Sequence, residues 1–154
     1  INFLHGIPHF AICIALKSHD EIISGLIFDP IKNEMFYAEK NNGAFFNNER
    51  IRVSKKNELS ECLFATGGKK YNSINEISTR KSGCAALDLA YVASGRYDGY
   101  WHREINYWDI AAGIILVKES GGFVETLNNG SFSEQKIDII ATNSKIHKKL
   151  KDLL

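Results

Sequence analysis

The sequence predicts a mixed α/β fold in which helices are layered on sheets. Three observations support this prediction. Short apolar runs separated by turn residues fill residues 1–66, as expected for an antiparallel sheet built from hairpins. In residues 67–154, apolar residues with helical spacing alternate with short strand-like runs. A length of 154 residues with 44% hydrophobic residues is enough for one core, so we expect a single domain over residues 1–154.

The first half is expected to be a meander. Residues 1–10 form a loop or a short helical turn that leads into the first strand. An Asn-Asn-Gly sequence at residues 41–43 is a strong turn signal between two strands. The predicted strands cover residues 10–16, 22–28, 34–39, 44–46 and 50–53, and a further short strand lies within 59–66.

The second half is expected to begin with a polar segment, residues 67–81, that has no usable period and forms a mobile loop or a marginal helix. A helix then runs from Ser82, which can cap it, to about Ser94. The remaining elements are a strand at 97–101, a helix at 108–120, strands at 122–127 and 137–142, and a last helix, capped by Asn143 or Ser144, that extends to 154.

Two helix starts are candidate binding sites. Asp109 stands at the start of the 108–120 helix, where free N–H groups favour an anion, so it is either an N-cap or a metal ligand. Spacing alone does not decide between these roles. Gly83, Cys84 and Ala85 open the preceding helix with small residues. Their N–H groups suit an anion such as phosphate, although tight helix–sheet packing explains the same pattern.

Composition narrows the class of protein. The net charge of +1, with no basic stripe, argues against direct nucleic-acid binding. No apolar run reaches membrane-spanning length and no signal peptide is visible, so we expect a cytoplasmic protein without membrane contact. Cys13, Cys62 and Cys84 are interpreted as buried, reduced thiols, because they are odd in number, widely spaced and set among apolar or small residues, with no Cys-x-x-Cys pair or zinc spacing.

Several motifs together resemble the inositol monophosphatase family, the magnesium-dependent, lithium-sensitive phosphatases. Residues 40–48 read Lys-Asn-Asn-Gly-Ala-Phe-Phe-Asn-Asn, similar to a hairpin of the family. Residues 83–95 read Gly-Cys-Ala-Ala-Leu-Asp-Leu-Ala-Tyr-Val-Ala-Ser-Gly, similar to its second signature. Trp-Asp-Ile-Ala-Ala-Gly at 108–113, followed by Glu-Ser-Gly-Gly at 119–122, is similar to its third. Residues 1–10 look like the segment that follows the family's Asp-Pro-Ile-Asp-Gly-Thr metal motif.

The resemblance implies a sandwich of the sugar phosphatase type and a set of site residues. Asp109 becomes a magnesium ligand beside the substrate hydroxyls, and Gly83, Cys84 and Ala85 line the substrate pocket. The nucleophile is a metal-activated water, so no catalytic side chain is expected within the chain. A homodimer is also implied, with the antiparallel half, residues 1–66, as the contributor; only Phe45, Phe46 and neighbouring apolar residues support this.

Three departures from the family pattern matter. The glutamate pair and the Asp-Pro-Ile-Asp-Gly-Thr loop that provide most metal ligands are expected before Ile1, so we expect the chain alone to be an inactive fragment. His102 stands where family members that act on inositol phosphate usually carry a glutamate, which puts the substrate in doubt, and Glu104 lies close by. The connection at 67–81 is shorter than usual, either because it is trimmed or because residues are omitted.

Asp29-Pro30-Ile31 looks like the start of the same metal motif, but the next position is Lys32, which offers no oxygen ligand. We interpret this segment as a hairpin turn and reject it as a site.

The first function hypothesis is a magnesium-dependent phosphomonoesterase that hydrolyses inositol monophosphate or a similar small polyol phosphate. A second keeps the fold and changes the substrate to fructose bisphosphate, a nucleotide 3′-phosphate or NADP. A third is a non-catalytic role in transcription control through protein partners, as in some bacterial proteins that resemble this family.

Overall fold

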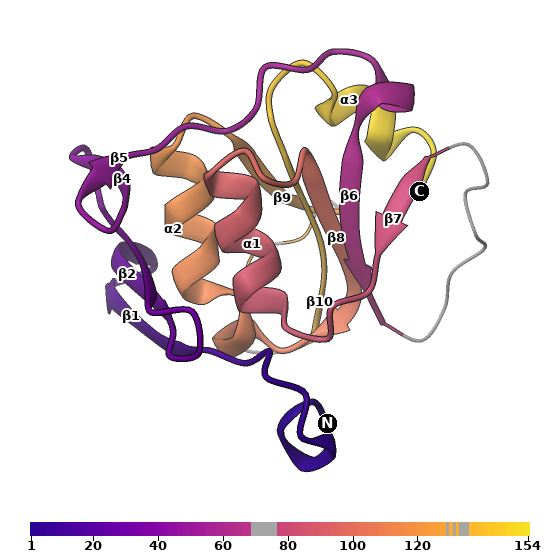
Figure 1. Ribbon diagram of the computed structural model, residues 1–154. Helices are drawn as coiled ribbons and strands as arrows, with labels where there is room; N and C mark the ends of the chain where they lie inside the picture. Colours follow the sequence, from indigo (N-terminus) through magenta and orange to yellow (C-terminus); the bar gives the residue numbers. More distant parts are fainter. Residues whose placement is uncertain (69–76, 129, 131, 133–135) are drawn as a thin grey trace.

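Two sheets enclose a layer of two helices (Figure 1). The computed structural model describes residues 1–68, 77–128, 130, 132 and 136–154. The central helices are α1 (Ala85–Ala93) and α2 (Ala111–Glu119). A shorter helix, α3 (His147–Lys151), lies on the other side of the second sheet. The predicted mixed α/β layering is therefore confirmed.

The first sheet is an antiparallel meander whose strands lie in sequence order. Its strands are β1 (Ile12–Ser18), β2 (Glu21–Asp29), β3 (Glu34–Glu39), β4 (Gly43–Phe46) and β5 (Glu49–Arg50). A 3-10 turn, η1 (Phe3–His5), precedes it. The last strand is shorter than the predicted 50–53, because the Val53 N–H bonds the Ser120 carbonyl at the end of α2 (3.2 Å) instead of a strand.

The second sheet is mixed and has the order β7-β6-β8-β10-β9. Its strands are β6 (Leu63–Gly67), β7 (Ser78–Arg80), β8 (Gly99–Ile105), β9 (Phe123–Thr126) and β10 (Ile137–Thr142). A 3-10 turn, η2 (Leu59–Glu61), precedes β6. The prediction of a loop or marginal helix at 67–81 is wrong where β7 pairs in parallel with β6. The rest of that prediction, at 69–76, lies outside the described residues.

The two central helices are apolar around most of their circumference because both sheets contact them. In α2, every residue from 111 to 117 is buried, which is more than the single buried face that the sequence predicts. Gly25 of β2 and Gly113 of α2 permit close approach. A Cβ at Gly25 would lie 2.8 Å from the Ala112 carbonyl, and one at Gly113 would lie 2.6 Å from Leu89 Cβ of α1.

A smaller core joins the outer face of the second sheet to α3. Its buried members come from the end of η2, from β6, β8 and β10 and from the C-terminal segment, and they are Cys62, Phe64, Trp101, Ile140, Ile146 and Leu150. Asn143 Oδ1 accepts hydrogen bonds from the N–H groups of Lys145 (2.9 Å) and Ile146 (3.2 Å), so it caps the turn that leads into α3. The helix itself is shorter than the predicted one, which extends to residue 154.

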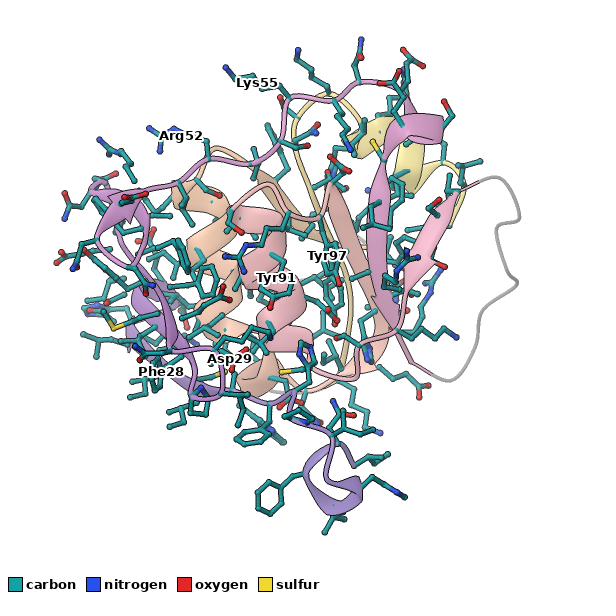
Figure 2. The ribbon with its side chains drawn as sticks, viewed as in Figure 1. Phe28, Asp29, Arg52, Lys55, Tyr91 and Tyr97 are labelled. Carbon is teal, nitrogen blue, oxygen red and sulfur yellow. The ribbon has the colours of Figure 1, made fainter. Side chains whose placement is uncertain are left out.

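The turn between β2 and β3 confirms that Asp29 is structural. Its Oδ1 accepts hydrogen bonds from the N–H groups of Ile31 (2.9 Å) and Lys32 (3.1 Å), and its Oδ2 pairs with Lys32 Nζ (2.7 Å). Lys32 also bonds Tyr91 of α1, so the fully buried carboxylate fastens the hairpin to the helix layer (Figure 2). Burial alone would raise the pKa of Asp29, but these hydrogen bonds outweigh it and hold the pKa below its usual value.

The cysteines fit the expectation of buried thiols only in part. All three are free thiols; Cys62 is buried and Cys84 is half-buried, but Cys13 on the edge strand β1 is exposed. The interpretation of Cys13 as buried is therefore wrong. None of the helices in the described ranges is long and apolar enough to cross a bilayer.

Candidate active site

One cavity of about 850 Å³ brings together all five residues predicted for the site. It lies where the first residues of the chain meet the start of α1, the last part of β8 and the turn before α2. Figure 1 shows the N-terminal segment below the first turn of α1. The predicted residues that line the cavity are Gly83, Cys84, Ala85, His102 and Asp109.

The carboxylate of Asp109 has no close hydrogen-bond or ion-pair partner among the described residues. Asp109 belongs to a 3-10 turn, η3 (Tyr107–Asp109), and the N-cap of α2 is Ile110, so the alternative of Asp109 as an N-cap is wrong. Its nearest hydrogen-bond donor among the described residues is Asn106 Nδ2, at 3.5 Å from Oδ2. This distance is at the limit of a hydrogen bond, and no ion pair to Asp109 exists in the described ranges. The carboxylate can therefore bind a cation that enters the cavity.

The start of α1 is held by side chains rather than capped by one. Ser82 Oγ accepts a hydrogen bond from the Cys84 N–H (3.1 Å) and donates to Asp88 Oδ1 (2.7 Å). The helix begins at Ala85 with Cys84 as N-cap, so the prediction of Ser82 as the cap is wrong. Asn2 Nδ2 donates to the Ser82 carbonyl (3.0 Å), which ties the N-terminal segment to this turn. The first-turn N–H groups of α1 have no helical partner, as at any helix start, and they suit an anion.

Asp88 is a buried acid in the cavity wall that sequence reasoning missed. It is 2% exposed, and this burial raises its pKa to about 7, although the hydrogen bond from Ser82 lowers it. The signal in the sequence that could have identified Asp88 is its place in the first turn of α1, where acids are common. The sequence could not show that the side chain is enclosed, since burial depends on the elements that pack around α1, among them α2, β2 and β8.

His102 is a half-buried hydrogen-bond acceptor. Its Nδ1 lies 2.7 Å from the Arg103 carbonyl, which only accepts, so Nδ1 carries the proton and Nε2 is free to accept when the ring is neutral. Burial lowers the pKa of His102, which favours the neutral ring. Gly67 of β6 leaves room for the imidazole, because a Cβ at Gly67 would overlap the ring.

The oxygen donors of the cavity suit a magnesium site that substrate and water complete, rather than one built from protein side chains alone. No group of three or more His, Cys, Asp or Glu side chains in the described ranges is arranged to hold a metal. Magnesium, however, is commonly held by one or two carboxylates together with substrate phosphate and water. One free carboxylate in the same cavity as a potential phosphate site fits that arrangement.

Comparison with known proteins finds a family match and relatives along the whole chain. A sequence profile of the inositol monophosphatase family matches residues 1–154. The chain is 38% identical over 167 residues to an inositol-1-monophosphatase of Rhizobium meliloti, with 99% of this chain and 63% of the relative covered. It is 38% identical over 165 residues to the Nus factor SuhB of Pseudomonas aeruginosa, with 97% and 61% covered.

The fold is shared with a solved relative. The extragenic suppressor protein suhB of Bartonella henselae matches with a TM-score of 0.90 and 48% identity, over 98% of this chain and 66% of that one. The chain thus spans slightly less than two thirds of the length of the proteins named here.

Proposed function

Because the chain belongs to the inositol monophosphatase family, we propose that it forms part of a magnesium-dependent phosphomonoesterase. Its substrate is inositol monophosphate or a similar small polyol phosphate. The observation that carries the proposal is the single cavity shared by Asp109 and the start of α1. A carboxylate for the cation and N–H groups for the phosphate then face the same space.

Each half of the substrate has a counterpart in the cavity. The phosphate lies at the first turn of α1, near Gly83 and Ala85, where N–H groups and the helix dipole favour negative charge. Asp109 would hold magnesium in the same cavity. When bound, magnesium neutralises phosphate charge and promotes the attack of water. The small residues at 83–85 let the phosphate approach the backbone, which a larger side chain would prevent.

The alcohol half of the substrate faces His102. Its neutral Nε2 accepts a hydrogen bond from a substrate hydroxyl, and its position is set by Gly67 and by the bond from Nδ1 to the Arg103 carbonyl. Water is the nucleophile, so the residues of this chain bind and orient the substrate rather than form a covalent bond to it.

Phosphate release tests this proposal. In the protein expressed from its complete gene, we expect hydrolysis of myo-inositol 1-phosphate that requires magnesium and is inhibited by lithium. Asp109→Asn should lower kcat at least about a hundredfold, because loss of charge stabilisation in a transition state typically costs that much. Asp152→Asn, which changes an exposed acid remote from the cavity, should keep full activity. Undiminished activity of Asp109→Asn would contradict the assignment.

The substrate is tested in the same assay with fructose 1,6-bisphosphate, a nucleotide 3′-phosphate and NADP. We expect the inositol monophosphate to have the highest kcat/KM. A higher value for any of the other three compounds would move the proposal to that substrate while leaving the role of Asp109 intact.

A second candidate function is binding of a protein partner in transcription. It is favoured by the relative of Pseudomonas aeruginosa, which is named a Nus factor. Capture of RNA polymerase by the purified protein, unchanged in Asp109→Asn, would support this function. Capture that fails for both proteins would exclude it.

A further inference from the structure

Glu104 has a backbone conformation that non-glycine residues rarely adopt. Its φ is +55°, in the left-handed region. It lies in β8 at a β-bulge: Ile137 and Ile139 of β10 pair with Ile105 and His102 of β8, so β8 carries one extra residue between the two pairs. Strained residues of this kind persist only where the surrounding structure holds them, and they are frequent at functional sites.

The bulge is held by the neighbouring strand β10. Asp138 Oδ1 accepts a hydrogen bond from the Glu104 N–H (2.8 Å), and Asp138 Oδ2 pairs with Arg103 Nη1 (3.0 Å). Arg103 Nη2 also donates to the carbonyl of Leu154 (2.8 Å). Two charged side chains thus fasten the strained segment from one side, and neither of them lines the cavity.

The side chain of Glu104 is left without a structural task. Glu104 lines the cavity together with His102, and its carboxylate has no hydrogen bond or ion pair to any described residue. Thr66 also lines the cavity; it is 4% exposed, and its hydroxyl has no partner within the described ranges. Glu104 is exposed, so its carboxylate is accessible from the cavity, whereas buried polar groups such as the Thr66 hydroxyl are normally paired. Both groups are therefore suited to a polar ligand.

We propose that Glu104 is a specificity-determining residue that accepts hydrogen bonds from the hydroxyl groups of an uncharged polyol monophosphate. Glu104 and the neutral Nε2 of His102 are both acceptors, so the pair selects hydroxyl donors on the leaving alcohol. The carboxylate repels a second phosphate at the same place, so the site disfavours bisphosphates. This inference rests on the proposed function and adds the part of the substrate that the enzyme distinguishes.

The test compares Glu104→Gln with Glu49→Gln, an exposed control on β5 outside the cavity, in the protein expressed from its complete gene. Glu104→Gln should raise KM for myo-inositol 1-phosphate about tenfold, as expected for loss of a charged acceptor, with a smaller change in kcat. KM for fructose 1,6-bisphosphate should fall, because the repulsion is removed. The magnesium concentration for half-maximal activity should not change. Unchanged KM values, or a raised magnesium requirement instead, would overturn the inference.

Glu104→Gly separates recognition from structure. Glycine adopts this φ without strain, so the variant should unfold at a higher temperature than wild type, by roughly a few degrees. KM for myo-inositol 1-phosphate should nevertheless rise as in Glu104→Gln. A residue with only a structural task would gain stability and keep its KM, which would overturn the inference.

Failure of the proposed function is distinguishable from failure of this inference. If the wild-type protein releases no phosphate, equilibrium binding of myo-inositol 1-phosphate and of inorganic phosphate is measured by calorimetry. Glu104→Gln should weaken the binding of myo-inositol 1-phosphate and leave the binding of inorganic phosphate unchanged. Equal weakening of both ligands, or no binding of the polyol phosphate to wild type, would overturn the role of Glu104.

Discussion

Asp109 illustrates what a single residue type can and cannot predict. The sequence predicts that Asp109 lies next to the start of a helix, and the structure has it there. The choice between N-cap and cavity carboxylate depends on a one-residue difference in where α2 begins, since the 3-10 turn η3 ends at Asp109 and Ile110 takes the N-cap position. Helix propensity does not locate the end of a helix to within one residue.

His102 and Glu104 show the same limit on a strand. The resemblance places His102 at the pocket and notes only that Glu104 lies close to it in sequence, because strand alternation cannot foresee a bulge. The bulge depends on Asp138, a residue more than thirty positions away that bonds the Glu104 N–H. Long-range contacts of this kind have no local signal in the sequence.

A pH prediction belongs to Asp88. Burial raises its pKa from 3.8 to about 7. Between these values the folded protein holds a proton that the unfolded chain has lost, so stability falls as pH rises through this window. Asp88→Asn keeps an oxygen acceptor for Ser82 and removes the titration. It should therefore raise the free energy of unfolding at pH 8 by about 1–4 kcal/mol and change it little at pH 4.

Urea unfolding at the two pH values, without magnesium, measures this difference. Asp152→Asn, at an exposed site, is the control. An equal effect of Asp88→Asn at pH 4 and pH 8 would show that Asp88 does not titrate as its burial requires.

At the scale of elements, regular strands with clear turns were predictable and irregular ones were not. β3 and β10 begin and end at the predicted residues because turn residues bound each apolar run. β7 was missed because its three residues, Ser-Thr-Arg, carry no apolar pattern. Its pairing with β6 is a tertiary contact, which overrides the weak local preference.

The contact between α1 and α2 allows a prediction at this scale. A Cβ at Gly113 would come within 2.6 Å of Leu89 Cβ, and both residues lie inside the helix layer. Gly113→Ala should therefore force the helices apart and lower the free energy of unfolding by about 1–3 kcal/mol, despite the better helix propensity of alanine.

Gly130→Ala is the control for that variant, because the nearest atom that the described residues place by a Cβ at Gly130, its chain neighbours aside, is Thr126 Oγ1 at 3.9 Å. Chemical denaturation of both variants measures the difference. Equal stability of Gly113→Ala and wild type would mean that the two helices pack less tightly than the structure shows.

At the scale of the whole molecule, the edge strand β1 of the first sheet is exposed along its whole length. Ala15 of β1 pairs with Gly25, which contacts α2, so the alternate residues of β1 point away from the helices. These residues are Ile12, Ile14 and Leu16, and they are 53%, 62% and 57% exposed. Phe46, considered for a dimer contact, instead packs against Phe36 with ring centroids 4.9 Å apart.

We therefore expect a homodimer to use the β1 face. Ile14→Lys should shift the protein expressed from its complete gene toward monomer in sedimentation equilibrium, because the lysine would bury an unpaired charge in an apolar contact. Ile31→Lys, at an exposed position in the β2–β3 turn, should leave the molecular mass unchanged. The same mass for Ile14→Lys and wild type would place the contact elsewhere.

The proposed active site requires a divalent cation at Asp109 that faces the start of α1. Binding of Mn²⁺, a spectroscopic substitute for magnesium, measures this directly by electron paramagnetic resonance in the protein expressed from its complete gene. Inorganic phosphate should tighten Mn²⁺ binding to wild type, and Asp109→Asn should weaken that binding at least about tenfold, since even indirect support of a ligand is worth that much. Equal Mn²⁺ affinity of wild type and Asp109→Asn, with phosphate present, would contradict the account.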